Sequence, residues 1–208
     1  MGTSEQSLPQ LVDAIVANDS ALFSKMIGAS PALATASFPK GATRQGASPG
    51  HYFIKEIGHY IYSRDTALHF AAASYRNRIA TKLIEAGANV RARNRRGSEP
   101  LHAAAFGNPG SARWDPTAQA ATIVCLIDAG ADPNAQNMDG ATPLHRAVRT
   151  RCAGAVRALL DHGANPAIKN KNGSTAMNLA LKAPGRSGSG SPEAKAQQQE
   201  ILLLLQGC

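Results

Sequence analysis

A Leu-His pair recurs along this 208-residue chain, and the residues around it recur with it. Aligning the chain on these pairs gives three similar segments, at residues 65–97, 98–140 and 141–173, and a fourth begins at Ser174. Similarity at a fixed period is typical of a stack of small units, in which each unit buries its apolar face against its neighbours. The repeat therefore predicts most of the fold.

Each unit has the residues of two short helices joined by a turn. In the third segment Thr142 can cap the first helix, and Pro143 suits its first turn, where a backbone N–H has no partner. A glycine that can adopt the left-handed conformation ends each second helix, at Gly87, Gly130 and Gly163. Small side chains let the first helices of neighbouring units touch: Ala71, Ala72, Ala104, Ala105 and Ala147.

The stretches "ATPLHRAV" and "ALLDHGAN" of the third segment resemble the ankyrin repeat, whose signature is T-P-L-H-x-A followed by a second helix ending in L-L-x-x-G-A. The resemblance covers most of residues 7–206 and is most specific in the three aligned segments. It implies an all-α fold, an ankyrin-repeat solenoid of helix-turn-helix units with β-hairpin or finger loops between them. It also implies a non-catalytic module that binds a protein partner.

The second helices keep a register that insertions interrupt. Equivalent positions are Met26, Leu83, Leu126, Leu159 and Leu205, so insertions of about 24, 10 and 13 residues disturb the period of 33. About five units, two of them caps, account for the chain. We expect a capping helix pair in 1–37, an aromatic-rich insertion in 38–64, repeats in 65–97, 98–140 and 141–173, and a capping repeat with a Gly/Ser-rich insertion in 174–208. In the first pair, helical spacing predicts the inward residues Leu11, Ala14, Ile15, Leu22, Met26 and Ile27.

The insertion at 38–64 holds five of the ten aromatic residues of the chain. A long loop in a compact domain is usually functional or disordered, and tyrosines argue against disorder. One side of a short helix could carry Tyr52, Phe53, Ile57, Tyr60 and Ile61. Two interpretations remain open, a lid that packs on the first unit and a surface that binds a partner, and both can hold together.

The stretch "GNPGSARWDPT" interrupts the second unit and contains the single tryptophan, Trp114. Asp115 can cap a helix and Pro116 can start it, so we expect the second helix to run from about residue 116 to Asp128. The indole is expected on the extension of that helix or on a neighbouring tip, and a partner contact is the alternative. The later insertion, "APGRSGSGSPEAKAQ", has the composition of a linker or mobile loop.

Basic residues gather in two places of a chain whose formal net charge is +8. Arg91, Arg93 and Arg95 alternate in one finger loop, where an extended arm would place them on one face. The second group lies on the first helix of the third unit. The resemblance places fingers and first helices along a concave groove, so it implies partner-binding candidates at Phe70, Ser74, Arg91, Arg93, Arg95, Arg96, Ala103, Phe106, Arg146 and Arg149, to which we add Tyr52, Tyr60 and Trp114. The positive charge favours an acidic protein partner.

Two other functions use the same residues. Binding of nucleic acid or another polyanion would need a continuous basic track with interleaved aromatic residues, and Asp139 breaks the track in the second finger. A small ligand or a substrate could instead enter a pocket under the aromatic insertion, built from Tyr52, Tyr60, Tyr62 and Trp114.

The residues predict neither a metal site nor a catalytic one. His69, His102 and His145 stand one per unit, roughly 10 Å apart, too far to share a zinc ion with bonds of about 2 Å; the family uses this position to bond backbone of a neighbouring finger. His51 and His59 lack companion ligands in the sequence. Cys125 is expected in the core, and Cys152 on an exposed tip where Arg149 and Arg151 would favour a thiolate. No cofactor-binding motif is present.

Three cysteines without a CxxC pair, an N-terminus without a signal pattern and no long apolar run lead us to expect a monomeric cytoplasmic protein that is not bound to membranes.

Overall fold

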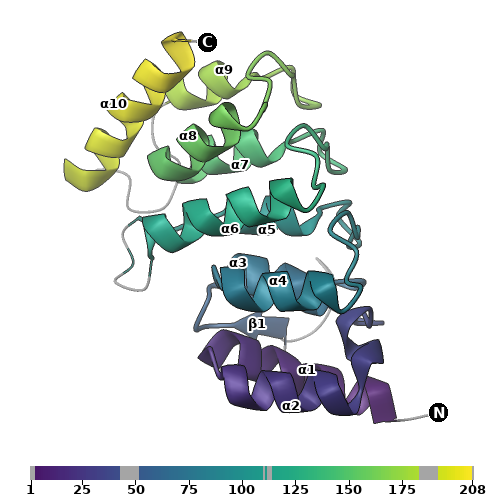
Figure 1. The fold of residues 1–208 in the computed structure, drawn as a ribbon. Coiled ribbons are helices and arrows are strands. Elements are labelled where there is room, and N and C mark those ends of the chain that lie inside the picture. The colour runs from purple at the N-terminus through teal and green to yellow at the C-terminus, as the bar shows by residue number, and fades with distance from the viewer. Residues whose placement is uncertain (1–2, 43–51, 110, 112–113, 183–191, 208) are drawn as a thin grey trace.

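The computed structural model describes residues 3–42, 52–109, 111, 114–182 and 192–207. Within these ranges the chain forms five helix pairs stacked in two layers (Figure 1). The first helices of the pairs form one layer: α1 (Thr3–Ala17), α3 (Ala67–Ala73), α5 (Pro100–Ala104), α7 (Pro143–Thr150) and α9 (Ala176–Leu181). The second helices form the other: α2 (Ser20–Ala29), α4 (Asn77–Glu85), α6 (Pro116–Asp128), α8 (Ala153–Asp161) and α10 (Pro192–Gln206). The predicted all-helical stack is confirmed.

A histidine joins each of the three central first helices to the next unit. In α3 the backbone N–H of Thr66 donates to His69 Nδ1 at 3.1 Å, so Nε2 carries the ring proton and donates to the carbonyl oxygen of Ser98 at 3.1 Å. His102 and His145 make the equivalent bonds to Ala141 and Ser174, at 3.0 and 2.9 Å. The bonding of these histidines to a neighbouring loop, which the family resemblance implied, is confirmed.

The helix ends follow the sequence signals. Thr142 accepts a hydrogen bond from the His145 backbone N–H, and Pro143 opens α7. Asp115 caps α6, which runs from Pro116 to Asp128 as predicted. Gly87, Gly130 and Gly163 have φ values of 92°, 96° and 87°, the left-handed conformation that ends a helix without strain only at glycine.

The N-terminal pair differs from the prediction by one residue in its second helix. Leu11, Ala14 and Ile15 of α1 are buried as expected. In α2, however, Leu22 is 42% exposed and Phe23 is buried. The side chain of Asp19 accepts hydrogen bonds from Ala21 N and Leu22 N, and this cap fixes the rotation of α2 so that Phe23 faces the core.

The loops between units are joined in a row. Arg95 N donates to Ser63 O, Met138 N to Arg96 O and Lys171 N to Asp139 O, at 2.8 to 3.0 Å. These finger loops contain turns and no strands in the part of the chain that the structure describes. Neighbouring loops are therefore joined by one such backbone bond at each step and by side-chain bonds such as Asn134 Nδ2 to Gly163 O, not by a sheet.

The aromatic insertion forms a hairpin instead of the short helix that spacing suggested. Strands β1 (Phe53–Ile54) and β2 (His59–Tyr60) pair antiparallel, with Phe53 opposite Tyr60. The rings of this pair lie 4.7 Å apart between centroids. Aromatic cross-strand pairs and a turn glycine, Gly58 with φ of 61°, stabilise a hairpin over a helix at this point.

Candidate protein-binding surface

We define the inner face as the surface formed by α3, α5, α7 and the finger loops 88–97, 131–140 and 164–173. At its N-terminal end the insertion packs on α3. The rings of Phe38 and His59 meet the ring of Phe70 edge to face, at 5.6 and 5.9 Å between centroids. Phe70 is completely buried as a result. The described part of the insertion thus lies on the stack as a lid, and Phe70 offers no surface to a partner.

Ser74 is the second groove candidate that the structure places in the interior. Its hydroxyl donates to Phe70 O at 2.6 Å, which satisfies it within its own helix. Its exposed fraction is 6%. The inner face is therefore not open over α3, where both predicted contact residues, Phe70 and Ser74, are buried.

Asp65 fixes the lid to the first unit. This fully buried carboxylate accepts hydrogen bonds from Tyr62 N at 2.7 Å and from Asn94 Nδ2 at 2.8 Å. His59 Nε2 lies 4.0 Å from it. Burial lowers the pKa of His59 to about 4 although the charge of Asp65 opposes this shift, so the imidazole is neutral at pH 7.

The arginines of the first finger are held by carboxylates of this same chain. Arg91 Nη2 lies 3.2 Å from Asp132 Oδ2, Arg93 Nε lies 3.1 Å from Glu99 Oε1, and Arg96 Nη2 lies 3.0 Å from Asp139 Oδ2. Arg96 also lies over the ring of Tyr62, with its Cζ 5.8 Å from the centroid. Arg95 is exposed and donates a long bond of 3.4 Å to Ala42 O.

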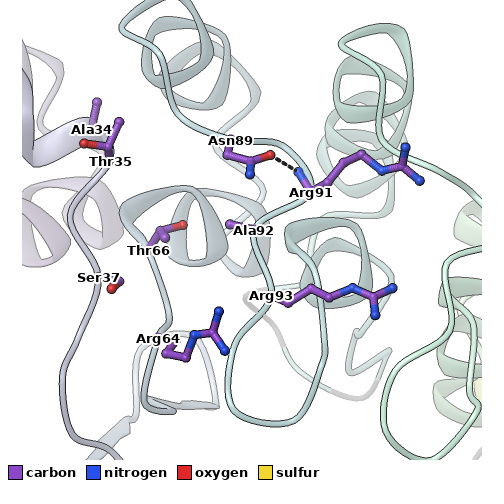
Figure 2. A pocket seen from close by; sticks show the side chains of 9 residues that line it. All are labelled: Ala34, Thr35, Ser37, Arg64, Thr66, Asn89, Arg91, Ala92 and Arg93. Atoms are coloured by element: carbon purple, nitrogen blue, oxygen red, sulfur yellow. Dashed lines mark hydrogen bonds between the residues drawn. The ribbon is translucent and has the colours of Figure 1, made fainter.

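The finger is not the extended arm that the alternation of arginines predicted. Asn89 accepts hydrogen bonds from Arg91 N through its side chain and from Ala92 N through its carbonyl, and these bonds form a turn. Arg91 and Arg93 do extend to the same side, as Figure 2 shows, but toward the acidic groups of Asp132 and Glu99. Most of the finger's charge is compensated locally.

A pocket of about 450 Å³ opens between the lid and this finger (Figure 2). It is lined by Ala34, Thr35, Ser37, Arg64, Thr66, Asn89, Arg91, Ala92 and Arg93. The guanidinium group of Arg64 points toward its interior, whereas those of Arg91 and Arg93 point away from it. None of Tyr52, Tyr60, Tyr62 and Trp114 lines this pocket, so it is not the aromatic pocket considered from the sequence.

The arginines of α7 differ from those of the finger. Arg146 is half-buried, and in the described residues its guanidinium makes one hydrogen bond, from Nη2 to Ser98 Oγ at 3.3 Å, and no ion pair. Arg149, one turn further along α7, is exposed. Burial lowers the pKa of Arg146 to about 10, and the positive charges of Arg149 and Arg96 add to the shift. Positive charge therefore exceeds negative charge around Arg146, where Asp139 compensates it only in part and through space.

The remaining candidates lie on α5 or after it, in the lid and before α6. Ala103 of α5 is buried, with the same exposed fraction of 6% as Ser74, whereas Phe106 and Tyr52 are half-buried and Tyr60 is 39% exposed. Trp114 Nε1 donates to Gln119 Oε1 at 2.8 Å, and Gln119 Nε2 donates to Ala104 O at 2.9 Å. The indole is thus fixed on the start of α6, in agreement with the expected packing on the lengthened helix.

Both described cysteines differ from their predicted environments. Cys152 is fully buried, and burial raises the pKa of its thiol to about 11, which opposes a thiolate. The reason is Arg151, whose left-handed backbone (φ of 59°) ends α7 and turns the next residue inward. Cys125 is half-buried, with its sulfur 3.3 Å from Thr81 Oγ1. The expected exposed Cys152 and core Cys125 are corrected accordingly.

Three further observations bear on other kinds of site. In the described ranges, no group of three or more His, Cys, Asp or Glu side chains is placed to hold a metal ion. Among those same residues, helices with the length and apolar character for crossing a membrane are absent. His51 and most of the Gly/Ser-rich insertion, residues 183–191, lie outside what the structure describes.

Two residues of this surface were not found from the sequence. Ser98 accepts the hydrogen bond from Arg146, and Arg64 reaches the pocket from a left-handed backbone with φ of 70°. Neither has a distinctive sequence neighbourhood. Their positions depend on the path of the lid and on the stacking of units, which a one-dimensional pattern does not contain.

The fold and its inner face define the class of this protein as a solenoid of stacked helix pairs. Residues 63–95 match the family model of the ankyrin repeat, and residues 126–180 match a model described as ankyrin repeats (many copies). The chain therefore contains ankyrin repeats in these two ranges. No curated protein sequence matches it significantly. Ankyrin repeats generally mediate protein–protein interactions and are typically non-catalytic.

Proposed function

We propose that this chain is a non-catalytic scaffold that binds a protein partner on the inner face, between the lid and the third finger loop. The observation that carries the proposal is the contrast along this face. The lid closes it over α3, and it remains accessible and positively charged at α7 through Arg146 and Arg149. Tyr60 and Tyr62 border the open part from the lid side, with rings 6.5 Å apart.

Arginine and tyrosine are the residue types that contribute most binding energy at protein interfaces. Nucleic-acid binding is less well supported, because Arg91, Arg93 and Arg96 are each paired with a carboxylate and do not form a free basic track. A monomeric cytoplasmic protein remains our expectation for its working state.

A photo-crosslinking experiment tests the proposal without changing the charge of the inner face. Tyr60→benzoylphenylalanine places a crosslinker at the border of the open part, and Arg78→benzoylphenylalanine places one at an exposed position of α4 in the other layer. We expect a discrete crosslinked protein from the source cell with the first variant only. Equal products from both positions, or none from Tyr60, would contradict binding on the inner face.

A further inference from the structure

We infer that the guanidinium of Arg146 is the docking point for a carboxylate of the partner, so that the partner presents an aspartate or glutamate to α7 rather than to the arginine-rich finger. This inference rests on the proposed function and adds the chemistry of the contact. Three observations lead to it: the pairing of the finger arginines, the single bond of Arg146, and the charges that surround it.

The first observation argues against three of the four finger arginines; the fourth, Arg95, is exposed and has no carboxylate partner among the described residues. Arg91, Arg93 and Arg96 have carboxylate oxygens of Asp132, Glu99 and Asp139 at 3.0 to 3.2 Å. A partner's carboxylate would have to displace these intramolecular ones. The gain would be small, because one ion pair would be exchanged for another at Arg91 and Arg96, and at Arg93 the buried Glu99 carboxylate would be left without its partner.

The second observation concerns the capacity of Arg146. A guanidinium has five N–H donors in a planar fork, and the described residues use one of them, on Ser98 Oγ. This side chain is also half-buried, which removes part of its hydration. A carboxylate can accept two parallel hydrogen bonds from such a fork, and the bonds are stronger where water is partly excluded.

The third observation is the local excess of positive charge. Arg149 and Arg96 act on Arg146 with the same sign of charge. The acidic group that acts on it with opposite sign, Asp139, is 3.0 Å from Arg96 and largely exposed. One added negative charge would relieve the repulsion among three arginines. The site therefore favours an anion more than any single surface arginine would.

Binding of a peptide probe tests this inference. The probe is a fluorescent, capped octapeptide of alternating aspartate and serine, and its control replaces every aspartate by asparagine. We expect the aspartate peptide to bind saturably and the asparagine peptide not to bind. Arg146→Gln should raise the Kd of the aspartate peptide at least ~10-fold. Arg146→Lys, which keeps the charge and loses the fork, should give an intermediate loss.

Matched variants separate this site from the general charge of the protein. Arg78→Gln removes one charge from α4, and Arg91→Gln removes a finger arginine that is already paired. Each should change the Kd less than about threefold. Circular dichroism checks that every variant is folded, and the Arg146 Nε–Hε resonance should move as the aspartate peptide is added.

The outcomes are distinct from those of the crosslinking experiment. Saturable binding that Arg146→Gln abolishes supports the inference. Binding that Arg91→Gln weakens as much, an unmoved Arg146 resonance, or no binding of the aspartate peptide overturns it, even if crosslinking from Tyr60 still finds a partner. A peptide with phosphoserine in place of aspartate that alone binds would assign the site to a phosphoryl group and would also overturn the carboxylate.

Discussion

The first finger and α7 are the two arginine-rich segments of this protein, and they differ in what surrounds their charges. In the finger, Arg91 and Arg96 form ion pairs with Asp132 and Asp139 of the next loop. On α7, Arg146 donates a hydrogen bond to the hydroxyl of Ser98, and no carboxylate of the described residues pairs with it. The comparison teaches that the number of arginines in a segment does not measure the charge that it offers to a partner.

Acidification should produce the largest change in stability. It acts on His102, whose pKa is influenced by an arginine of each segment. Burial lowers the pKa of His102 to about 3, and the charges of Arg146 and Arg93 both contribute. Burial likewise lowers the pKa of His59 to about 4. Because the unfolded chain takes up protons near pH 6.5 and the folded one does not, stability falls as pH drops from about 6.5 toward 4.

At pH 5 each of these two histidines should cost roughly 2 kcal/mol of unfolding free energy relative to pH 7. Urea denaturation at both pH values measures the loss, and histidine NMR titration identifies the groups. A midpoint that does not move, together with normal titration of His102, would contradict a buried neutral histidine beside the two segments.

Replacing one arginine of each segment by methionine should lower stability in the finger and should not lower it on α7. Arg93→Met leaves the buried Glu99 carboxylate without its ion pair, and its Oε2 already has no hydrogen-bond partner in the described residues. We expect a loss of about 1–2 kcal/mol, reduced by the exposure of Arg93. Arg146→Met removes a half-buried cation that has no ion pair, so stability should stay the same or increase slightly.

Denaturant unfolding of the two variants in parallel measures this difference. The double variant should show additive changes if the segments are energetically separate. Equal losses for both substitutions would mean that Arg146 stabilises the fold as Arg93 does, and the contrast between the segments would then not hold.

The smallest effect should come from removing the carboxylate partner of a finger arginine, so that this arginine, like Arg146, has no ion pair. Asp139→Asn removes the carboxylate that pairs with Arg96 and keeps a side chain of nearly the same size and shape. Because the pair is exposed, stability should change by less than about 1 kcal/mol. The aspartate octapeptide should bind about two- to fivefold more tightly. Fluorescence anisotropy at low and high salt measures the gain, and unchanged affinity would indicate that Arg96 lies outside the contact.

Much of the fold could be predicted because its signals are local. Helix starts are indicated by residues next to them in the sequence, and the structure has helices beginning after Thr142, at Pro143, and at Pro116. The hairpin at residues 53–60 was not predicted, since a short run of aromatic and aliphatic residues fits a helix or a strand. The burial of Cys152 was not predicted, because it depends on the left-handed backbone of Arg151. Glycine or asparagine would have indicated such a conformation in the sequence, and arginine does not.

The ion pair between Arg96 and Asp139 could have been predicted from the sequence once the repeat period was known. Arg96 and Asp139 are 43 residues apart, the same distance that separates Leu101 from Leu144 across the enlarged unit. Residues at equivalent positions of adjacent units are neighbours in the stack, so this pair was predictable. The same reasoning gives Arg146 the neighbours Ala103 and Leu179, neither of which carries a charge. The burial of Phe70 was not predictable in this way, because it depends on the lid.

The lid also decides how a bound segment is aligned. Phe70, Ala103 and Arg146 occupy the same position in successive units, and a surface built from equivalent units has an approximate translational symmetry. An extended ligand on such a surface can slide by one unit and still find similar contacts. Because the rings of Phe38 and His59 cover Phe70, one end of the surface is a wall. A ligand that meets this wall has a single register, and the distance from the wall to Arg146 then selects which of its residues must be acidic.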